Sequence, residues 1–172
     1  MGSSVAAVRC RPAGREDWGA IAAINRRAFA GEEEALLVER LRREGAALVE
    51  MVADEDGEAV GHILFSRLGG EAAAGAPSLA ALAPMAVLPE RQRRGIGSAL
   101  IEAGLDGCRD AGVDAILVVG HPDYYPRFGF SAAAAAMIRT PYAGPAFMGL
   151  DLTPGTLATI REVRYPAAFE GL

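Results

Sequence analysis

Hydrophobic and polar residues follow two different spacings along the first half of the chain. Apolar runs rich in Val, Leu and Ala predict strands over residues 5–11, 46–53 and 58–68. The segment between the last two, 54–57, is acidic and ends in a glycine that can adopt a positive φ. These two strands are therefore expected to form a hairpin.

Two amphipathic helices are predicted between the first strand and this hairpin. The first opens within 14–17, and the second begins at the acidic run 32–34 and ends in arginines, a charge order that suits the helix macrodipole. Helical spacing puts one apolar set on a buried face of each helix. The first helix should bury Trp18, Ile21, Ile24 and Phe29. The second should bury Leu36, Leu37 and Leu41.

The middle of the chain has the pattern of a crossover unit. A strand over 79–88 leads to a helix over 96–111 and then to a continuous apolar strand over 113–120, so the two strands should be parallel. Pro84 lies inside the first of these strands. Because proline donates no hydrogen bond to a neighbouring strand, it predicts an edge, a bulge or a splayed position.

The remaining segments give weaker signals. The Gly- and Ala-rich stretch 69–77 is typical of a loop, and the alanine run 132–136 fits a helix or a strand. Strand-like pieces occur around 136–139 and 146–152. With no internal repeat or linker, residues 1–172 are expected to form a single domain.

Between the strand at 79–88 and its following helix lies a basic turn with two glycines one residue apart, Gly95 and Gly97. Small residues there allow consecutive backbone N–H groups to turn toward one anion, and the helix adds its positive N-terminal end. Arg91, Arg93 and Arg94 bring cationic side chains to this turn in a chain of formal net charge -5. The turn predicts a cradle for a phosphorylated ligand, with an ordinary loop bearing solvated arginines as the alternative.

Composition removes several classes of function. All 17 basic residues are arginine, which excludes a Walker P-loop and a pyridoxal enzyme because both require a lysine. An acidic chain with a pI near 5.1 and no basic stripe argues against nucleic-acid binding. The chain has no apolar run near the ~20 residues that cross a bilayer and no leader pattern, so we expect a cytoplasmic protein without membrane contact.

Two further short patterns carry no prediction of a site. Residues 1–4 begin like a myristoylation signal, but Ala6 stands where that signal has Ser or Thr. Cys10 and Cys108 are too far apart to form a metal or redox pair by spacing. We expect two buried, reduced thiols and no metal.

The strand-turn-helix with Gln92-x-x-Gly95-x-Gly97, followed by the segment 124–130 of sequence Tyr-Tyr-Pro-Arg-Phe-Gly-Phe, resembles the GNAT-type N-acetyltransferase superfamily. The lead-in at 84–90 and the form of the aromatic segment are similar to its bacterial YhbS-like subgroup. The resemblance implies an α/β (α+β) fold. Its central sheet would be mixed and strongly twisted, with about six to seven strands flanked by helices and one splayed pair of parallel strands.

By this resemblance the co-substrate is acetyl-coenzyme A. Met85, Ala86 and Val87 would lie along its pantetheine arm, in the slot that the splayed strand opens at Pro84. A backbone N–H of Ala86 or Val87 would polarise the thioester carbonyl. The residues implied to hold the pyrophosphate are Gln92, Arg93, Arg94, Gly95, Ile96, Gly97 and Ser98.

The resemblance also implies direct attack of a neutral amine on the thioester. Tyr125 would donate a proton to the leaving thiolate, and Tyr124 is the adjacent alternative. The strand over 79–87 contains no ionisable residue, so the carboxylate that some relatives carry there is missing. The general base is therefore not identified. Water could carry the proton away from the amine, or the amine could arrive already neutral.

Several ionisable residues remain as candidate bases, each with a structural role as the alternative: Glu33, Glu34, His121 and Asp123. His62, on a strand, is interpreted as a half-buried structural histidine. Phe128-Gly129-Phe130 is interpreted as a structural turn between aromatic side chains.

The acceptor would be a small-molecule or peptide amine, and the protein a monomer or homodimer. Residues 69–77, the early helices and the tail after Pro141 are candidate walls of its site, and acidic residues on the early helices would suit a cationic amine. A non-catalytic acyl-coenzyme A sensor or interaction module is the alternative function. A dinucleotide-binding dehydrogenase fits poorly, since Leu100 takes the position of the third glycine.

Overall fold

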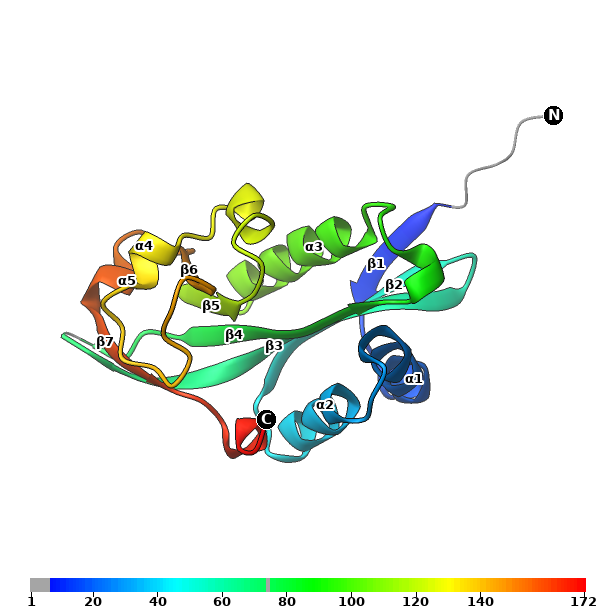
Figure 1. The fold of residues 1–172 in the computed structure, drawn as a ribbon, viewed down its shortest axis with the longest axis horizontal. Helices are drawn as coiled ribbons and strands as arrows, with labels where there is room; N and C mark the ends of the chain where they lie inside the picture. Colours follow the sequence, from blue (N-terminus) through cyan, green and yellow to red (C-terminus); the bar gives the residue numbers. More distant parts are fainter. Residues whose placement is uncertain (1–6, 74) are drawn as a thin grey trace.

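The computed structural model describes residues 7–73 and 75–172. A seven-stranded sheet in the order β1-β2-β3-β4-β5-β6, with β7 paired to β3, forms the centre of the molecule. Neighbouring strands are antiparallel except for β4 and β5, which are parallel (Figure 1). The strands are β1 Val8–Pro12, β2 Ala47–Glu55, β3 Glu58–Ala72, β4 Leu79–Val87, β5 Ala115–Val119, β6 Phe147–Asp151 and β7 Ile160–Arg164.

Helices cover both faces of the sheet. The helices α1 (Trp18–Phe29) and α2 (Glu33–Arg43) lie on one face, and α3 (Ile96–Asp110) lies on the other (Figure 1). Two one-turn helices, α4 (Ala132–Ala135) and α5 (Thr156–Thr159), accompany β6. The predicted mixed α/β fold with a parallel pair is confirmed. Among the described residues, no helix is both long enough and apolar enough to span a membrane.

The β2–β3 hairpin is confirmed, with its strands extended to Glu55 and Glu58. The two residues between them, Asp56 and Gly57, have φ values of 51° and 80°. Two successive positive φ values match the right-handed twist of paired strands, which explains the Asp-Gly sequence there.

The crossover from β4 through α3 to β5 is also confirmed. Parallel pairing runs from Leu79 opposite Ala115 to Leu82 opposite Val118 and extends no further, although β4 continues to Val87. Opposite β3, the register shifts between Leu82 and Met85, so a bulge contains Pro84. The proline thus lies at a bulge and at the point where β4 and β5 separate, as its missing N–H predicts.

Three aromatic or aliphatic side chains expected in the core are instead partly exposed: Trp18 by 39%, Phe29 by 43% and Leu36 by 41%. The guanidinium carbons of Arg42 and Arg15 lie 4.6 and 5.3 Å from the ring centroid of Trp18, so cation–π contacts cover it in place of the core. Leu36 falls outside the buried stripe of α2, which consists of Ala35, Leu37, Val38 and Leu41.

The loop expected at 69–77 is wrong in its first part. Residues 69–72 continue β3 and pair antiparallel with β7, a strand that the sequence patterns did not reveal. The strand expected at 136–139 is also wrong, since only an isolated bridge joins Arg139 to Glu162. The alanine run becomes α4 because Ser131 Oγ caps it, accepting a hydrogen bond from the Ala134 N–H at 3.2 Å.

Some expectations fall on residues that the structure does not describe. The pattern at residues 1–4 lies outside the described residues, as do the first two residues of the strand expected at 5–11. That strand is present as β1, which begins at Val8.

Candidate active site

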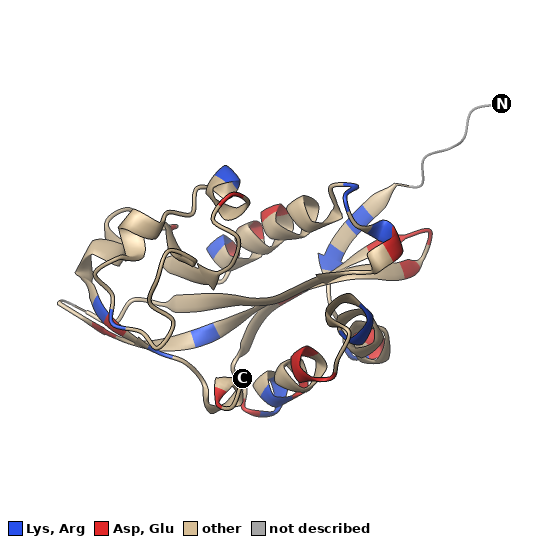
Figure 2. Ribbon diagram, in the orientation of Figure 1, with Lys and Arg blue, Asp and Glu red and all other residues tan. Residues whose placement is uncertain are grey.

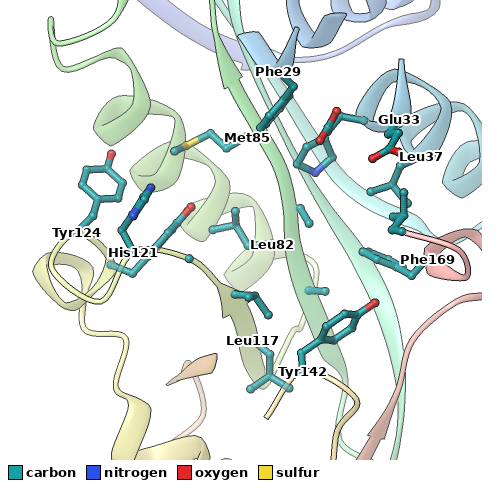
Figure 3. A pocket seen from close by; sticks show the side chains of 18 of the residues that line it. Phe29, Glu33, Leu37, Leu82, Met85, Leu117, His121, Tyr124, Tyr142 and Phe169 are labelled. Carbon is teal, nitrogen blue, oxygen red and sulfur yellow. The ribbon is translucent and has the colours of Figure 1, made fainter. Parts of the chain in front are cut away.

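A cleft with a volume of about 840 Å³ opens between β4 and β5, beyond their last paired residues. β4 contributes its second half, β5 contributes its carboxyl end, and the two early helices and the C-terminal segment close the other side. Figure 3 shows Glu33, Leu37 and Phe169 on one side of β4, with His121 and Tyr124 on the other. The cleft therefore has two halves, one facing α3 and one facing α2.

The backbone of β4 is open along this cleft. The Leu88 N–H bonds to the Val60 carbonyl, on the β3 side, at 2.9 Å. Because backbone groups alternate in direction along a strand, the N–H and C=O of Val87 and Met85 point to the opposite edge, which β5 has left. The carbonyl of Val87 there accepts a hydrogen bond from Gln92 Nε2 at 3.1 Å. The backbone N–H and C=O of Ala86 point toward β3, like those of Leu88. Its side chain is buried in the core, and Ala86 is not among the residues that line the cleft.

The turn after β4 leaves a set of backbone donors at the start of α3. Arg93 and Gly95 both have positive φ values, 64° and 81°, and Gly95 is the N-cap residue. The first hydrogen bond inside the helix runs from the Ala99 N–H to the Gly95 carbonyl at 3.0 Å. The N–H groups of residues 96–98 come before this first bond and have no backbone carbonyl within the helix to accept their hydrogen bonds. They are therefore available to an anion.

The three arginines near this turn differ in their surroundings. Arg91 forms an ion pair with Glu55. This partner raises the pKa of the Arg91 guanidinium above its usual value. Arg93 and Arg94 are exposed. Only these two of the three arginines are therefore free to approach a ligand on the turn.

Tyr125 lies in the wall of the cleft and is only 8% exposed. Its ring lies against Gly120, where a Cβ would come within 2.2 Å of Cε2, so that position leaves room only for glycine. Burial, and to a smaller extent the neighbouring Tyr124, raises the pKa of the Tyr125 phenol to about 12. No described residue forms a hydrogen bond with its hydroxyl, which remains protonated at neutral pH and able to donate.

Tyr124 is oriented differently. Its hydroxyl lies 3.4 Å from Ser98 Oγ, at the start of α3, and its ring makes edge contacts with Tyr125 and Phe128 at centroid distances of 5.2 and 5.4 Å. Figure 3 shows it on the α3 side of the cleft, near Met85. Tyr124 is thus next to the start of α3, whereas Tyr125 packs against Gly120, directly after β5.

The candidate bases separate by position. Glu33, Glu34 and His121 line the cleft, but Asp123 is exposed and does not. Glu33 and Glu34 lie in the first turn of α2, where Figure 2 shows acidic residues, while β4 carries none. The structure thus brings the two carboxylates to the same cleft as Tyr125 but assigns the base to neither.

His62 is fully buried rather than half-buried. Asn25 Nδ2 donates to its Nδ1 at 3.1 Å, so its Nε2 carries the proton and donates to Glu50 Oε1 at 2.8 Å. Burial lowers the pKa of His62, more than the neighbouring Glu50 raises it, and keeps the ring neutral. Its role is structural, tying α1 to the sheet, and it does not line the cleft.

The α2 side of the cleft contains residues for which the sequence patterns predicted no place in the cleft. They come from the end of α1, from α2 and from the segments around β6 and β7. The early helices and the tail after Pro141 were expected as walls, and both contribute, whereas the described residues of the stretch 69–77 do not. The added lining residues are Phe29, Leu37, Tyr142, Tyr165, Phe169 and Leu172. The only available signal was the density of aromatic residues after Pro141.

Neither cysteine lines the cleft. Cys10 and Cys108 are free thiols, Cys108 buried and Cys10 partly so, and burial raises the pKa of Cys108 to about 12. Within residues 7–73 and 75–172, no three His, Cys, Asp or Glu side chains gather as metal ligands would.

Comparison with known proteins connects this cleft to one family. The Acetyltransferase (GNAT) family profile matches residues 14–130. The uncharacterized N-acetyltransferase YjhQ of Escherichia coli K12 is 38% identical over 122 residues, covering 70% of this chain and 67% of that protein. The uncharacterized N-acetyltransferase YhbS of the same strain is 33% identical over 125 residues, with coverages of 72% and 74%.

Two solved structures extend the similarity over nearly the whole chain. The crystal structure of the GNAT family N-acetyltransferase YhbS from E. coli in complex with CoA superimposes with a TM-score of 0.87, at 29% identity, covering 98% of this chain and 95% of that one. A GNAT family acetyltransferase from Brucella melitensis in complex with acetyl-CoA gives a TM-score of 0.78 at 31% identity, with coverages of 95% and 99%.

Proposed function

Because this chain belongs to the acetyltransferase (GNAT) family, we propose that it transfers an acetyl group from acetyl-coenzyme A to a primary amine, by direct attack in a ternary complex. One observation carries the proposal: the open edge of β4 and Tyr125 line a single cleft, and that cleft reaches the unbonded N–H groups at the start of α3 through Gln92 and through Tyr124, whose hydroxyl lies 3.4 Å from Ser98 Oγ. Binding of CoA and acetyl-CoA by the two similar structures supports the choice of donor.

The donor would lie along residues whose backbone faces the cleft. Met85 and Val87 would pair with the pantetheine arm, and the pyrophosphate would bind the N–H groups of residues 93–98, with Gln92, Arg93 and Arg94 beside it. The direction of the Leu88 N–H favours Val87 over Ala86 as the group that polarises the thioester carbonyl, since Ala86 faces β3.

The chemistry requires one bond to form and one to break. The amine nitrogen bonds to the carbonyl carbon, the carbon–sulfur bond breaks, and the thiolate takes the phenolic proton of Tyr125. The proton that the nitrogen loses on becoming an amide returns to the Tyr125 phenolate through water. Tyr125 thus ends each cycle protonated, and its raised pKa keeps it so at neutral pH.

Calorimetric titration with acetyl-coenzyme A, followed by thiol release with a panel of primary amines, tests the proposal. We expect saturable binding and thiol release that depends on the amine. The chain has no lysine, so acetylation of its own lysine side chains cannot contribute thiol. Tight binding without thiol release from any amine would replace the enzyme with a coenzyme A sensor, and absence of binding would overturn both.

A further inference from the structure

The α2 half of the cleft has a built aromatic wall. The rings of Tyr142 and Tyr165 pack edge to face at a centroid distance of 4.7 Å, and those of Tyr165 and Phe169 at 5.1 Å. Phe169 is 8% exposed and belongs to the core cluster that contains Leu37 of α2. Packing against α2 therefore holds this wall in place before any ligand binds.

Phe29 adds an apolar group at the same cleft. It is the last residue of α1, is 43% exposed and lines the cleft together with Leu37. Figure 3 shows Leu37 beside Phe169, and Phe29 farther along β4, near Met85. An exposed aromatic ring beside a preformed aromatic wall is stabilised when an apolar ligand removes both from water.

The charge of this half is negative. Glu33 and Glu34 line the cleft, and no arginine does. Within the described part of the chain, neither carboxylate forms an ion pair, whereas their neighbours on the same helix do: Glu32 with Arg26 and Glu39 with Arg43. Two unpaired carboxylates beside apolar rings create a potential that attracts a cation and repels an anion.

From this juxtaposition we propose that the acceptor is a small arylalkylamine, a primary amine that is cationic in solution and carries one apolar ring. The ring and its alkyl chain would lie against Phe29, Leu37 and Phe169, and the ammonium would enter beside Glu33 and Glu34 and release one proton to water before the neutral amine attacks. The inference rests on the proposed acetyl transfer and names its acceptor class.

Other amines fit the same wall poorly. An aminosugar would place hydroxyl groups against Phe29, Leu37 and Phe169, whose side chains offer no hydrogen bond to them. A polyamine would satisfy the carboxylates but leave the aromatic wall uncovered, and a phosphorylated amine would meet repulsion from Glu33 and Glu34.

The first test compares kcat/KM for phenethylamine, hexylamine, putrescine and glucosamine, read as thiol release at saturating acetyl-coenzyme A. We expect phenethylamine to exceed putrescine and glucosamine by about tenfold or more, with hexylamine between them. Higher values for putrescine or glucosamine would overturn the inference while leaving the acetyl transfer intact. A preference for a peptide N-terminus over phenethylamine would overturn it as well.

Substitutions distinguish the contribution of the two carboxylates from that of the Phe29 ring. Glu33→Gln and Glu34→Gln should raise KM for phenethylamine about threefold to fivefold and leave KM for acetyl-coenzyme A unchanged. Glu39→Gln, on the same helix but outside the cleft, is the matched control. Phe29→Ala should raise KM for phenethylamine and hardly change that for putrescine. Equal effects of Glu33→Gln and Glu39→Gln would contradict a role of the carboxylate.

Binding keeps the inference testable if turnover fails. Phenethylamine is titrated calorimetrically into the protein saturated with CoA. Binding that Glu33→Gln weakens, without thiol release, would support the acceptor class and overturn the proposed transfer. If phenethylamine does not bind but polar amines cause thiol release, the proposed transfer is supported and the arylalkylamine acceptor is overturned.

Discussion

The two halves of the cleft are built in different ways. The α3 half is built around one continuous segment, the end of β4 and the turn that leads into α3, which presents mainly backbone N–H and C=O groups, and the segment after β5 adds His121, Tyr124 and Tyr125. The α2 half is assembled from side chains at the ends of α1 and α2 and in the C-terminal segment. Backbone recognition tolerates few substitutions at its glycines, whereas a side-chain wall can be altered residue by residue.

This difference predicts that the largest single effect comes from Gly97→Val. A Cβ at Gly97 would come within 3.1 Å of the Tyr124 hydroxyl and 3.5 Å of Met85 Cε, on the side where the cradle opens. We expect the Kd for acetyl-coenzyme A, measured by calorimetry, to rise about 100-fold or more.

Gly19→Val is the control for this variant. Gly19 also lies in the first turn of a helix, α1, and a Cβ there would meet no atom within 4 Å. It should leave stability nearly unchanged or slightly higher, because valine has a somewhat better helix propensity than glycine, and it should leave coenzyme affinity as it is. Equal loss of affinity in both variants would mean that the start of α3 is not the cradle.

The next largest effect is expected for Tyr125→Phe. Loss of the phenolic proton donor should reduce kcat by about 100-fold and leave KM for acetyl-coenzyme A nearly unchanged, because the ring and its contacts remain. Steady-state thiol release measures both constants. Tyr124→Phe is the control and should change kcat less than about threefold; the opposite order would transfer the acid role to Tyr124.

The pH dependence of kcat tests the same residue without a substitution. A proton donor acts while protonated, below its pKa, and the pKa of Tyr125 is raised to about 12. The wild-type kcat should therefore show no alkaline fall up to about pH 10. A decline centred near pH 9 that Tyr125→Phe abolishes would show that the phenol ionises far too early for this environment.

The smallest effect is expected at an exposed arginine of the turn. Arg94→Gln should weaken acetyl-coenzyme A binding by about threefold at low salt and less at high salt, because an exposed charge is screened. Calorimetry at two salt concentrations gives both values. A salt-independent loss as large as that of Gly97→Val would mean that side chains, rather than backbone, hold the anion.

The same contrast explains what could be predicted from the sequence. The turn and the splay are local: Gly95 and Pro84 act through the backbone of a continuous segment, so the sequence alone indicated a glycine-bearing turn before α3 and an edge, bulge or splayed position at Pro84. The α2 half depends on tertiary contacts between distant segments. Phe29 shows the limit, because its helical spacing predicted a core position and only the neighbouring cleft explains its exposure.

Strand β7 (Ile160–Arg164) shows the same limit for the fold. It has five residues, and its partner is the end of β3, within the Gly- and Ala-rich stretch that is typical of a loop. Neither segment carries a clear strand pattern alone, and each is stabilised by the other. A pairing of this kind is decided by long-range contact rather than by local sequence.

A crystal structure of the protein with acetyl-coenzyme A tests the central claim most directly. We predict the pyrophosphate on the N–H groups of residues 93–98, the pantetheine arm along Met85 and Val87, and the thioester sulfur within about 3.5 Å of the Tyr125 hydroxyl. A coenzyme bound elsewhere, or a sulfur atom beside Tyr124 and remote from Tyr125, would contradict the account.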